Sequence, residues 1–244
     1  MVAKPNETPE LSILMPVFNE AGTVERAILD VANAELPFSW ELIVVDDGST
    51  DGSSTILAEG KWPDSVKVLH HDHNQGKGAA VRTALAEAHG EYAAILDADL
   101  EYSARDLTPL LEPLRSGDAN VCFGVRAFNG QSSHSFIFVL GNRLVTMVAN
   151  LLFNVYLGDL MTCHKVLRTD LFKQLPLREP GFAIEPEIAA CVLNRGERIF
   201  EVPVGYRARR TEEGKKLTWV DGLRVVRTLV RCRVEAARGT SGVP

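Results

Sequence analysis

Cysteine is scarce in this chain of 244 residues, and its four cysteines stand far apart. None belongs to a CxxC pair, the spacing that zinc sites commonly use. The same wide spacing argues against a disulfide framework. We therefore expect free, buried thiols in a reducing compartment. These thiols belong to Cys122, Cys163, Cys191 and Cys232.

A long uninterrupted apolar run is missing as well. The segment "SFIFVLGNRLVTMVANLLFNVYLGDL" (135–160) comes nearest, but three asparagines and Arg143 interrupt it. An arginine near the middle of a membrane span costs roughly 2.5–3.5 kcal/mol on insertion scales. We predict an amphipathic helix here, either buried or lying on an interface, rather than a membrane span.

The first ten residues, "MVAKPNETPE", do not have the apolar stretch of a signal peptide, and we predict that residues 1–10 are disordered. Hydrophobic residues make up 45% of the chain and charged residues 24%, which is ordinary for a soluble globular protein. The length suits one large domain or two small ones.

Positive charge is concentrated near the C-terminus. Residues 195–238 contain 12 Lys and Arg against 6 Asp and Glu, a net charge of +6, whereas the whole chain carries −6. A basic segment on an acidic body indicates an anionic partner, either nucleic acid or a lipid head group. Because no basic groove rich in aromatic residues accompanies it, we expect no nucleic-acid partner.

Apolar strands and helices alternate through the first hundred residues. This rhythm predicts a Rossmann-like α/β domain with a mostly parallel sheet and helices on both faces. The predicted strands are 11–19, 40–48, 66–72 and 92–100. The main predicted helices between them are 20–34 and one within 74–90, where a glycine-punctuated turn precedes a helix that ends at Gly90.

Polar residues follow each predicted strand. Ligands of such sheets bind at the carboxyl ends of the strands, so these residues are expected to meet at one ligand-binding edge. They are Asn19-Glu20, Asp46-Asp47, His70 to Asn74, and Asp97-Ala98-Asp99.

Three carboxylates stand at alternate positions in "AAILDADLEY": Asp97, Asp99 and Glu101. In an extended segment such residues point the same way. Mg²⁺ and Mn²⁺ prefer oxygen ligands and often bind one or two carboxylates together with substrate phosphates. The alternatives are a solvated acidic turn or a helix cap. The metal interpretation gains weight because a strand precedes the cluster and a second acid pair ends a neighbouring strand.

The order of these segments resembles a known family. "LSILMPVFNEAGTV", "ELIVVDDGSTDGS", "NQGKGAAVRTAL" and "AAILDADLEY" are similar to the signature blocks of family 2 inverting glycosyltransferases of the GT-A fold. "GDLMTCHKVLRTDLFKQL" and "GFAIEPEIAACVLNRGERIFEVPVGYRARRTEEGKK" further resemble the polyprenyl-phosphate (dolichyl-phosphate) mannose and glucose synthases. The resemblance covers about residues 11–233. It implies a GT-A catalytic domain over 11–217.

The resemblance implies a GDP- or UDP-hexose donor, Mg²⁺ or Mn²⁺, and a polyprenyl phosphate acceptor. Asp99 would ligate the metal and Asp97 the metal or the donor sugar, whereas Glu101 stands where relatives often carry Gln. Glu20 has a rival role as an acid at a helix N-terminus. The implied nucleotide pocket comprises Pro16, Phe18, Glu20, Asp47 against the base, and Ala98.

Lys77 lies in the glycine-flanked "GKG". The flanking residues allow backbone and one cation to approach the nucleotide, although the spacing is not that of a P-loop. A helix-opening turn with a solvated Lys77 is the equally open alternative.

The acceptor determines what the site must supply. A sugar hydroxyl must lose a proton, so its transferase needs a carboxylate base. A lipid monophosphate, with a second pKa of roughly 6, is already anionic and can attack directly. For that acceptor the site must align, neutralise charge and exclude water, so cations matter most.

The resemblance gives three arginines such roles. Arg126 and Arg143 would grip the acceptor phosphate, and Arg209 would meet the donor diphosphate. A surface ion pair is the alternative for Arg126, and a snorkelling side chain is the alternative for Arg143. The register around Arg209 stays open by one or two residues.

Two acids complete the implied site. Asp159 matches an acidic position near the acceptor, with a helix cap as the alternative. Glu187, together with Glu185, lies in a block near the donor sugar, although either acid would also suit the start of a helix.

The C-terminal segment 218–238 has apolar residues at helical spacing and arginines on another face. This pattern is typical of a helix on anionic lipid, and equally of a core-packed helix with a solvated basic face. We expect peripheral attachment to the cytoplasmic, inner face of the membrane. Two other functions stay open: transfer to a glycan hydroxyl, and a non-catalytic nucleotide- or nucleic-acid-binding module.

Overall fold

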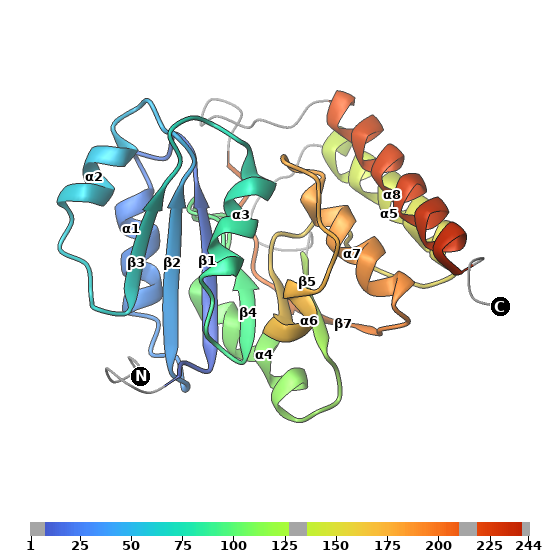
Figure 1. The fold of residues 1–244 in the computed structure, drawn as a ribbon, viewed down its shortest axis with the longest axis horizontal. Coiled ribbons are helices and arrows are strands. Elements are labelled where there is room, and N and C mark those ends of the chain that lie inside the picture. Colours follow the sequence, from blue (N-terminus) through green and yellow to red (C-terminus); the bar gives the residue numbers. More distant parts are fainter. Residues whose placement is uncertain (1–7, 127–135, 210–218, 241–244) are drawn as a thin grey trace.

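The structure is a computed structural model that describes residues 8–126, 136–209 and 219–240. One seven-stranded sheet forms its centre, with helices on both faces (Figure 1). The strands are β1 (Leu11–Val17), β2 (Trp40–Asp46), β3 (Val66–His70), β4 (Tyr92–Ile95), β5 (Val121–Arg126), β6 (Lys165–Arg168) and β7 (Ile199–Val204). The α-helices are α1 (Val24–Ala32), α2 (Ser53–Glu59), α3 (Lys77–Ala86), α4 (Leu107–Arg115), α5 (Phe136–Phe153), α6 (Thr169–Lys173), α7 (Ile184–Asn194) and α8 (Trp219–Thr240).

The strands are arranged in the order β3-β2-β1-β4-β6-β5-β7. All neighbouring pairs are parallel except those of β6, which runs antiparallel to both β4 and β5. The predicted mostly parallel α/β sheet is therefore confirmed. The antiparallel β6 was not predicted, because its four residues are too short to give a distinct pattern.

The central strands are buried on both faces, as their unbroken apolar sequences require. Successive side chains of a strand point to opposite faces, so Ile13 and Leu14 enter different cores. Helices α1 and α4 cover one core, whereas α3, α7 and parts of α5 and α8 cover the other. The two layers fix the strand ends at one edge.

Two predicted elements are longer than the observed ones. Within 74–90 a turn precedes the helix, as predicted; the helix begins at Lys77, after Gly76 with a φ of +97°, and ends at Ala86 rather than at Gly90. Strand β4 ends at Ile95 rather than at residue 100, so the acid cluster lies in turns. Of the predicted disordered segment 1–10, residues 1–7 lie outside the described residues, and the Glu10 amide donates to the Ser39 carbonyl at 3.0 Å.

Helices α5 and α8 lie side by side at one end of the molecule (Figure 1). They correspond to the helices predicted within 135–160 and 218–238. Within the three described ranges, every helix falls short of the length or apolar character that a bilayer crossing requires.

Candidate active site

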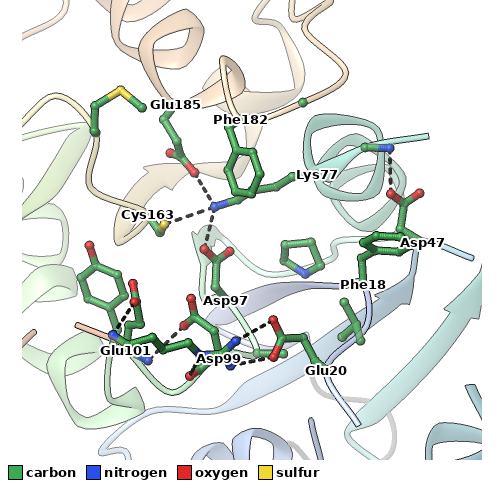
Figure 2. A pocket seen from close by; sticks show the side chains of 18 of the residues that line it. Phe18, Glu20, Asp47, Lys77, Asp97, Asp99, Glu101, Cys163, Phe182 and Glu185 are labelled. Atoms are coloured by element: carbon green, nitrogen blue, oxygen red, sulfur yellow. Dashed lines mark hydrogen bonds and ion pairs between the residues drawn. The ribbon is translucent and has the colours of Figure 1, made fainter. Parts of the chain in front are cut away.

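A pocket lies at the carboxyl ends of β1, β2 and β4 (Figure 2). Eleven predicted site residues line it: Pro16, Phe18, Glu20, Asp47, Lys77, Asp97, Ala98, Asp99, Glu101, Arg126 and Arg209. Glu185, named above together with Glu187, also lines it, and so do Tyr102, Cys163, Phe182 and Tyr206, which were not among the candidate residues. The predicted residues that do not line it are Arg143, Asp159 and Glu187.

Lys77 is a buried cation at the centre of the pocket (Figure 2). Its Nζ lies 2.7 Å from Asp97 Oδ2 and 2.8 Å from Glu185 Oε1, and it donates to Cys163 Sγ at 3.2 Å. Burial alone would lower the pKa of Lys77, but the neighbouring anionic groups outweigh it and raise that pKa well above the usual value. The solvated-lysine alternative is therefore wrong, since the side chain is only 8% exposed.

Glu185 lies between two ammonium groups. Besides its ion pair with Lys77, Glu185 Oε2 accepts a hydrogen bond from Lys165 Nζ at 2.7 Å. Lys165 lies on β6, is fully buried and also bonds the Thr162 carbonyl. Sequence reasoning missed Lys165, because nothing local distinguishes a lysine in the short segment "CHKVL" from one on a surface. Both oxygens of this pocket carboxylate are thus engaged with cations.

Asp97 and Asp99 concentrate negative charge beside Lys77. Burial raises the pKa of Asp97, but Lys77 overcomes this and holds it below its ordinary value. Burial, followed by repulsion from Asp97 and Glu101, raises the pKa of Asp99 from 3.8 to about 7. Asp97 Oδ1 is buried and has no hydrogen-bond partner among the described residues.

Glu101 is held by protein groups. Its Oε2 accepts from the Tyr206 hydroxyl and its Oε1 from the Arg209 amide, both at 2.9 Å. The Glu101 carbonyl accepts from the Arg207 amide at 2.8 Å. Glu101 therefore fastens residues 206–209 to the acid-bearing turn. The basic residues that follow, from Arg210 to Lys216, lie outside the described residues.

The expected set of three metal-binding carboxylates is not preformed. No group of three or more His, Cys, Asp or Glu is arranged to hold a metal within the described parts of the chain. In this conformation β4 ends early and Glu101 bonds the 206–209 segment, and the three-carboxylate ligand set stays a prediction. Asp97 and Asp99 still fit a divalent cation: one offers an orphaned buried oxygen, and the other is destabilised by its like-charged neighbours. A cation of this kind often takes only one or two carboxylates and completes its shell with phosphates and water.

Glu20 and Arg209 close one side of the pocket as a pair. The Arg209 guanidinium donates to Glu20 Oε1 at 3.0 Å and to Oε2 at 2.6 Å. Its Nε donates to the Asp99 carbonyl at 3.0 Å. Glu20 lies just before α1, and its side chain contacts both Arg209 and Thr23, the N-cap residue of that helix, so the helix-start role stays open beside the nucleotide-binding one.

Asp47 orders the loop after β3. Its Oδ1 lies 2.7 Å from His71 Nδ1 and accepts from the Gln75 amide at 2.9 Å, and Oδ2 accepts from the Gly76 amide at 2.7 Å. Asp47 is only 2% exposed, so most of its hydrogen-bonding capacity shapes this side of the pocket. Its neighbour Asp46 accepts from the Ser49 amide and the Ser54 hydroxyl, as expected for a turn-forming residue.

Arg126 and Asp159 form a buried bidentate pair at the other end of the pocket. Arg126 Nε donates to Asp159 Oδ2 at 2.6 Å, and NH2 donates to Oδ1 at 2.8 Å. Asn142, on α5, donates to the same carboxylate at 3.1 Å. Asp159 is thus a partner of Arg126 and not a helix cap, and the surface-pair alternative for Arg126 is wrong. Arg143 follows Asn142 but is exposed on α5.

Glu187 lies behind the pocket rather than in it. Its Oε2 accepts from the amides of Arg178 and Glu179 at 2.9 and 2.8 Å, and its Oε1 pairs with Arg231 at 2.7 Å. Of the two acids in the "IEPE" segment, the structure places Glu185 at the pocket. Both belong to the first turn of α7, as the helix-start alternative expected.

The sequence of the chain matches a known protein family and several of its members. The profile described as Glycosyl transferase family 2 matches residues 12–175. The glycosyltransferase AglJ of Haloferax volcanii is 30% identical over 204 residues, which cover 83% of this chain and 65% of AglJ. The dolichol-phosphate mannosyltransferase of Pyrococcus furiosus is 26% identical over 94% of this chain and 66% of its own length. The chain therefore spans less than two thirds of the length of these relatives.

A solved structure shows the same fold. Glucosyl-3-phosphoglycerate synthase from Mycobacterium tuberculosis, in complex with Mn²⁺, UDP and glucosyl-3-phosphoglycerate, superposes with a TM-score of 0.70 and 20% identity. The match covers 97% of this chain and 81% of that one. The same enzyme has been crystallised with Mn²⁺, UDP-glucose and phosphoglyceric acid, with a TM-score of 0.69. The predicted GT-A fold is confirmed.

Proposed function

Because the chain belongs to glycosyl transferase family 2, we propose that it transfers a hexose from a sugar nucleotide to a polyprenyl monophosphate, with inversion at the sugar. The products would be a polyprenyl-phosphate hexose and a nucleoside diphosphate. The donor is a GDP- or UDP-hexose. Mannose is the first hexose to test, because one relative is a dolichol-phosphate mannosyltransferase.

The environment of Glu185 carries this choice of acceptor. A hydroxyl acceptor requires a carboxylate that can take up its proton. Glu185 is ion-paired at both oxygens, to Lys77 and to Lys165, so both oxygens face ammonium groups rather than an acceptor hydroxyl. A lipid monophosphate needs no such base. The engaged carboxylate therefore supports a phosphate acceptor over a glycan hydroxyl.

The donor diphosphate would lie between the acid-bearing turn and the basic side chains near it. Asp97 and Asp99 would hold Mg²⁺ or Mn²⁺, which neutralises charge on a leaving diphosphate when bound. Lys77 orients Asp97, and Arg209 lies against the carbonyl of Asp99. For Arg209 to meet a phosphate, it must exchange at least one of its hydrogen bonds to Glu20.

The acceptor phosphate would approach the Arg126 end. The pair with Asp159 fixes the plane of the guanidinium, which lies 5.1 Å from the centroid of the Tyr206 ring. Buried and preorientated, Arg126 loses little conformational entropy on binding a phosphate. Asn142 connects this pair to α5, the helix that bears Arg143.

We also propose that α5 and α8 contact the cytoplasmic face of an anionic membrane. Both helices expose large apolar side chains together with arginines, among them Arg143 and Arg227. Such a surface suits the headgroup region of a bilayer, where the lipid tail of the acceptor lies. The exposed apolar residues are Leu140, Leu144, Met147 and Leu151 on α5, and Leu223, Val230 and Val234 on α8.

A donor panel tests the proposal. Purified protein is incubated with Mn²⁺, a polyprenyl monophosphate and, in separate reactions, radiolabelled GDP-mannose, UDP-glucose and UDP-N-acetylglucosamine. We expect label in the organic extract with one of these donors. Label that appears only in an added glycan would favour the hydroxyl acceptor, and binding without turnover would favour the non-catalytic module.

A further inference from the structure

Helix α8 presents three different faces. Val225, Leu229 and Cys232 are buried in the core. A second face, at 228, 231 and 235, contacts the segment that precedes α7. The third face is the exposed one with Leu223, Val230 and Val234. The spacing of three, four and seven residues within each set matches the period of an α-helix.

The second face of α8 contacts two glutamates, Glu179 and Glu187, that lie outside this helix. Arg231 NH2 lies 2.8 Å from Glu179 Oε1 and 2.7 Å from Glu187 Oε1. The Thr228 hydroxyl donates to the same oxygen of Glu179 at 2.9 Å. Glu187 is 1% exposed and Arg231 is 33% exposed, so one end of this cluster is buried. Breaking it would leave a buried carboxylate without its cation.

Glu187 in turn binds the backbone of residues 178–182, the segment that leads to the pocket. Its Oε2 accepts from the consecutive amides of Arg178 and Glu179. This contact fixes the start of residues 178–182, the segment that ends with Gly181 and Phe182 at the pocket. The side chain that orders the segment is therefore itself ordered by α8.

The same segment supports the N-terminus of α3. The Glu179 carbonyl accepts from Arg82 NH1 at 2.7 Å, and the Pro180 carbonyl accepts from the Ala79 amide at 3.2 Å. The fit is close, because a Cβ on Gly78 would lie 2.1 Å from the Glu179 carbonyl oxygen. Residues 178–182 thus bear directly on the turn that carries Lys77.

We infer that Arg231 is a positioning residue for the donor end of the pocket, acting through Glu187 and Glu179 on residues 178–182 and Lys77. The inference rests on the proposed function, since it assigns the donor nucleotide to that end. It also means that α8 has two roles: its outer face meets the surroundings, and its inner face sets the geometry at which the donor is held. Neither glutamate needs to touch the substrate for this effect.

Calorimetric titration of UDP and of GDP, each with Mn²⁺, tests the inference without an acceptor. Arg231→Gln should weaken the binding of the preferred nucleotide about 3- to 30-fold, the range expected for coupling through a packed network. Arg231→Lys should recover part of the loss. In transfer assays the same variant should raise the KM for the donor and leave the KM for polyprenyl phosphate unchanged.

Arg233→Gln is the matched control. Arg233 also lies on α8, but it contacts Phe153 and Asn194 rather than residues 178–182. It should leave nucleotide affinity unchanged. Combining Arg231→Gln with Glu187→Gln should add little to the loss, because both disrupt one connection.

Two results would overturn the inference: unchanged affinity in Arg231→Gln, or an equal loss in Arg233→Gln. A fall in melting temperature without a change in affinity would show a purely structural role and overturn it too. If the wild-type protein bound neither nucleotide, the proposed function would fail together with the inference. Wild-type binding with an unaffected variant would remove the inference alone.

Discussion

The Lys77 ammonium lies 2.7 Å from Asp97 and 2.8 Å from Glu185, in a pocket where its side chain is only 8% exposed. One cation therefore balances two buried carboxylates from different parts of the fold. The arrangement joins the acid-bearing turn after β4 to the start of α7. Among the described residues, the cation that acts on Asp99, two residues from Asp97, is Arg209, and it does not prevent burial and the neighbouring acids from raising the pKa of Asp99.

Replacing Lys77 with Met should cost about 3–5 kcal/mol of unfolding free energy, because the Asp97 and Glu185 carboxylates lose their shared cation. Transfer should fall as well, since Asp97 would no longer be oriented. Urea denaturation measures the first effect. The double variant Lys77→Met, Asp97→Asn should be more stable than Lys77→Met alone; a double variant that is less stable would show that the ion pair is not what Lys77 contributes.

Asp99→Asn should stabilise the metal-free protein at pH 8 while abolishing transfer. The pKa of Asp99 is raised from 3.8 to about 7 in the folded state. The folded protein thus binds more protons than the unfolded chain between about pH 4 and pH 7, and it loses stability as pH rises through that window. Above pH 7, Asp99 is ionised in the folded state as well, and its buried charge then destabilises the fold to the full extent. Removing the charge should recover about 1–3 kcal/mol at pH 8 and little at pH 4, measured by denaturation at both pH values.

Binding of Mn²⁺ should weaken steeply below neutral pH. A proton on Asp99 competes with the cation, so the apparent affinity should fall about tenfold for each pH unit below about 7. Titration with Mn²⁺ in the presence of UDP or GDP, between pH 5.5 and 8, measures this. An affinity that does not vary over the range would place the metal away from Asp99.

Asp159→Asn should impair use of the acceptor more than use of the donor. Asp159 orients Arg126 by accepting hydrogen bonds from its Nε at 2.6 Å and its NH2 at 2.8 Å, and the substitution removes the charge of that carboxylate. We expect the KM for polyprenyl phosphate to rise about tenfold or more, because a misplaced arginine binds phosphate in fewer productive geometries. Separate kinetic titrations of the two substrates provide the measurement. Equal changes in both KM values would contradict the assignment of this end to the acceptor.

Arg143→Ala tests the membrane-facing helix in a similar way. Arg143 is exposed on α5 and does not line the pocket. If it meets the lipid phosphate or the anionic surface, its loss should weaken transfer to a polyprenyl phosphate in vesicles and leave UDP or GDP binding intact. Reduced nucleotide binding by this variant would overturn the division between acceptor and donor ends.

The strand pattern of the sequence was enough to predict the sheet edge at which the site lies. The apolar runs that become β1, β2 and β4 are each followed by polar residues, and parallel strands bring those residues together. Eleven of the predicted site residues do line one pocket. Family resemblance supplied most of the individual roles, and local pattern alone would have left Asp99 and Arg126 among many surface charges.

The contacts that the sequence did not reveal are all long-range. Glu187 and Glu185 share one helical turn, and only the position of α8 decides which of them is tied to Arg231. Lys165 becomes a buried cation paired with Glu185 because β6 inserts antiparallel between β4 and β5. Glu101 follows the acid pair in sequence, but Tyr206 and Arg209 approach from the other end of the chain and take up its oxygens. The local sequence pattern cannot predict these contacts, because each joins residues that are far apart in the chain.

The most direct test compares two acceptors that differ only in the phosphate. Protein, Mn²⁺ and the labelled sugar nucleotide are incubated with a polyprenyl monophosphate or with the corresponding free polyprenol. With Glu185 held between Lys77 and Lys165, we expect label in the lipid extract with the phosphate and none with the alcohol. Comparable labelling of the alcohol would show that a base operates in the pocket, and the proposed phosphate acceptor would then be wrong.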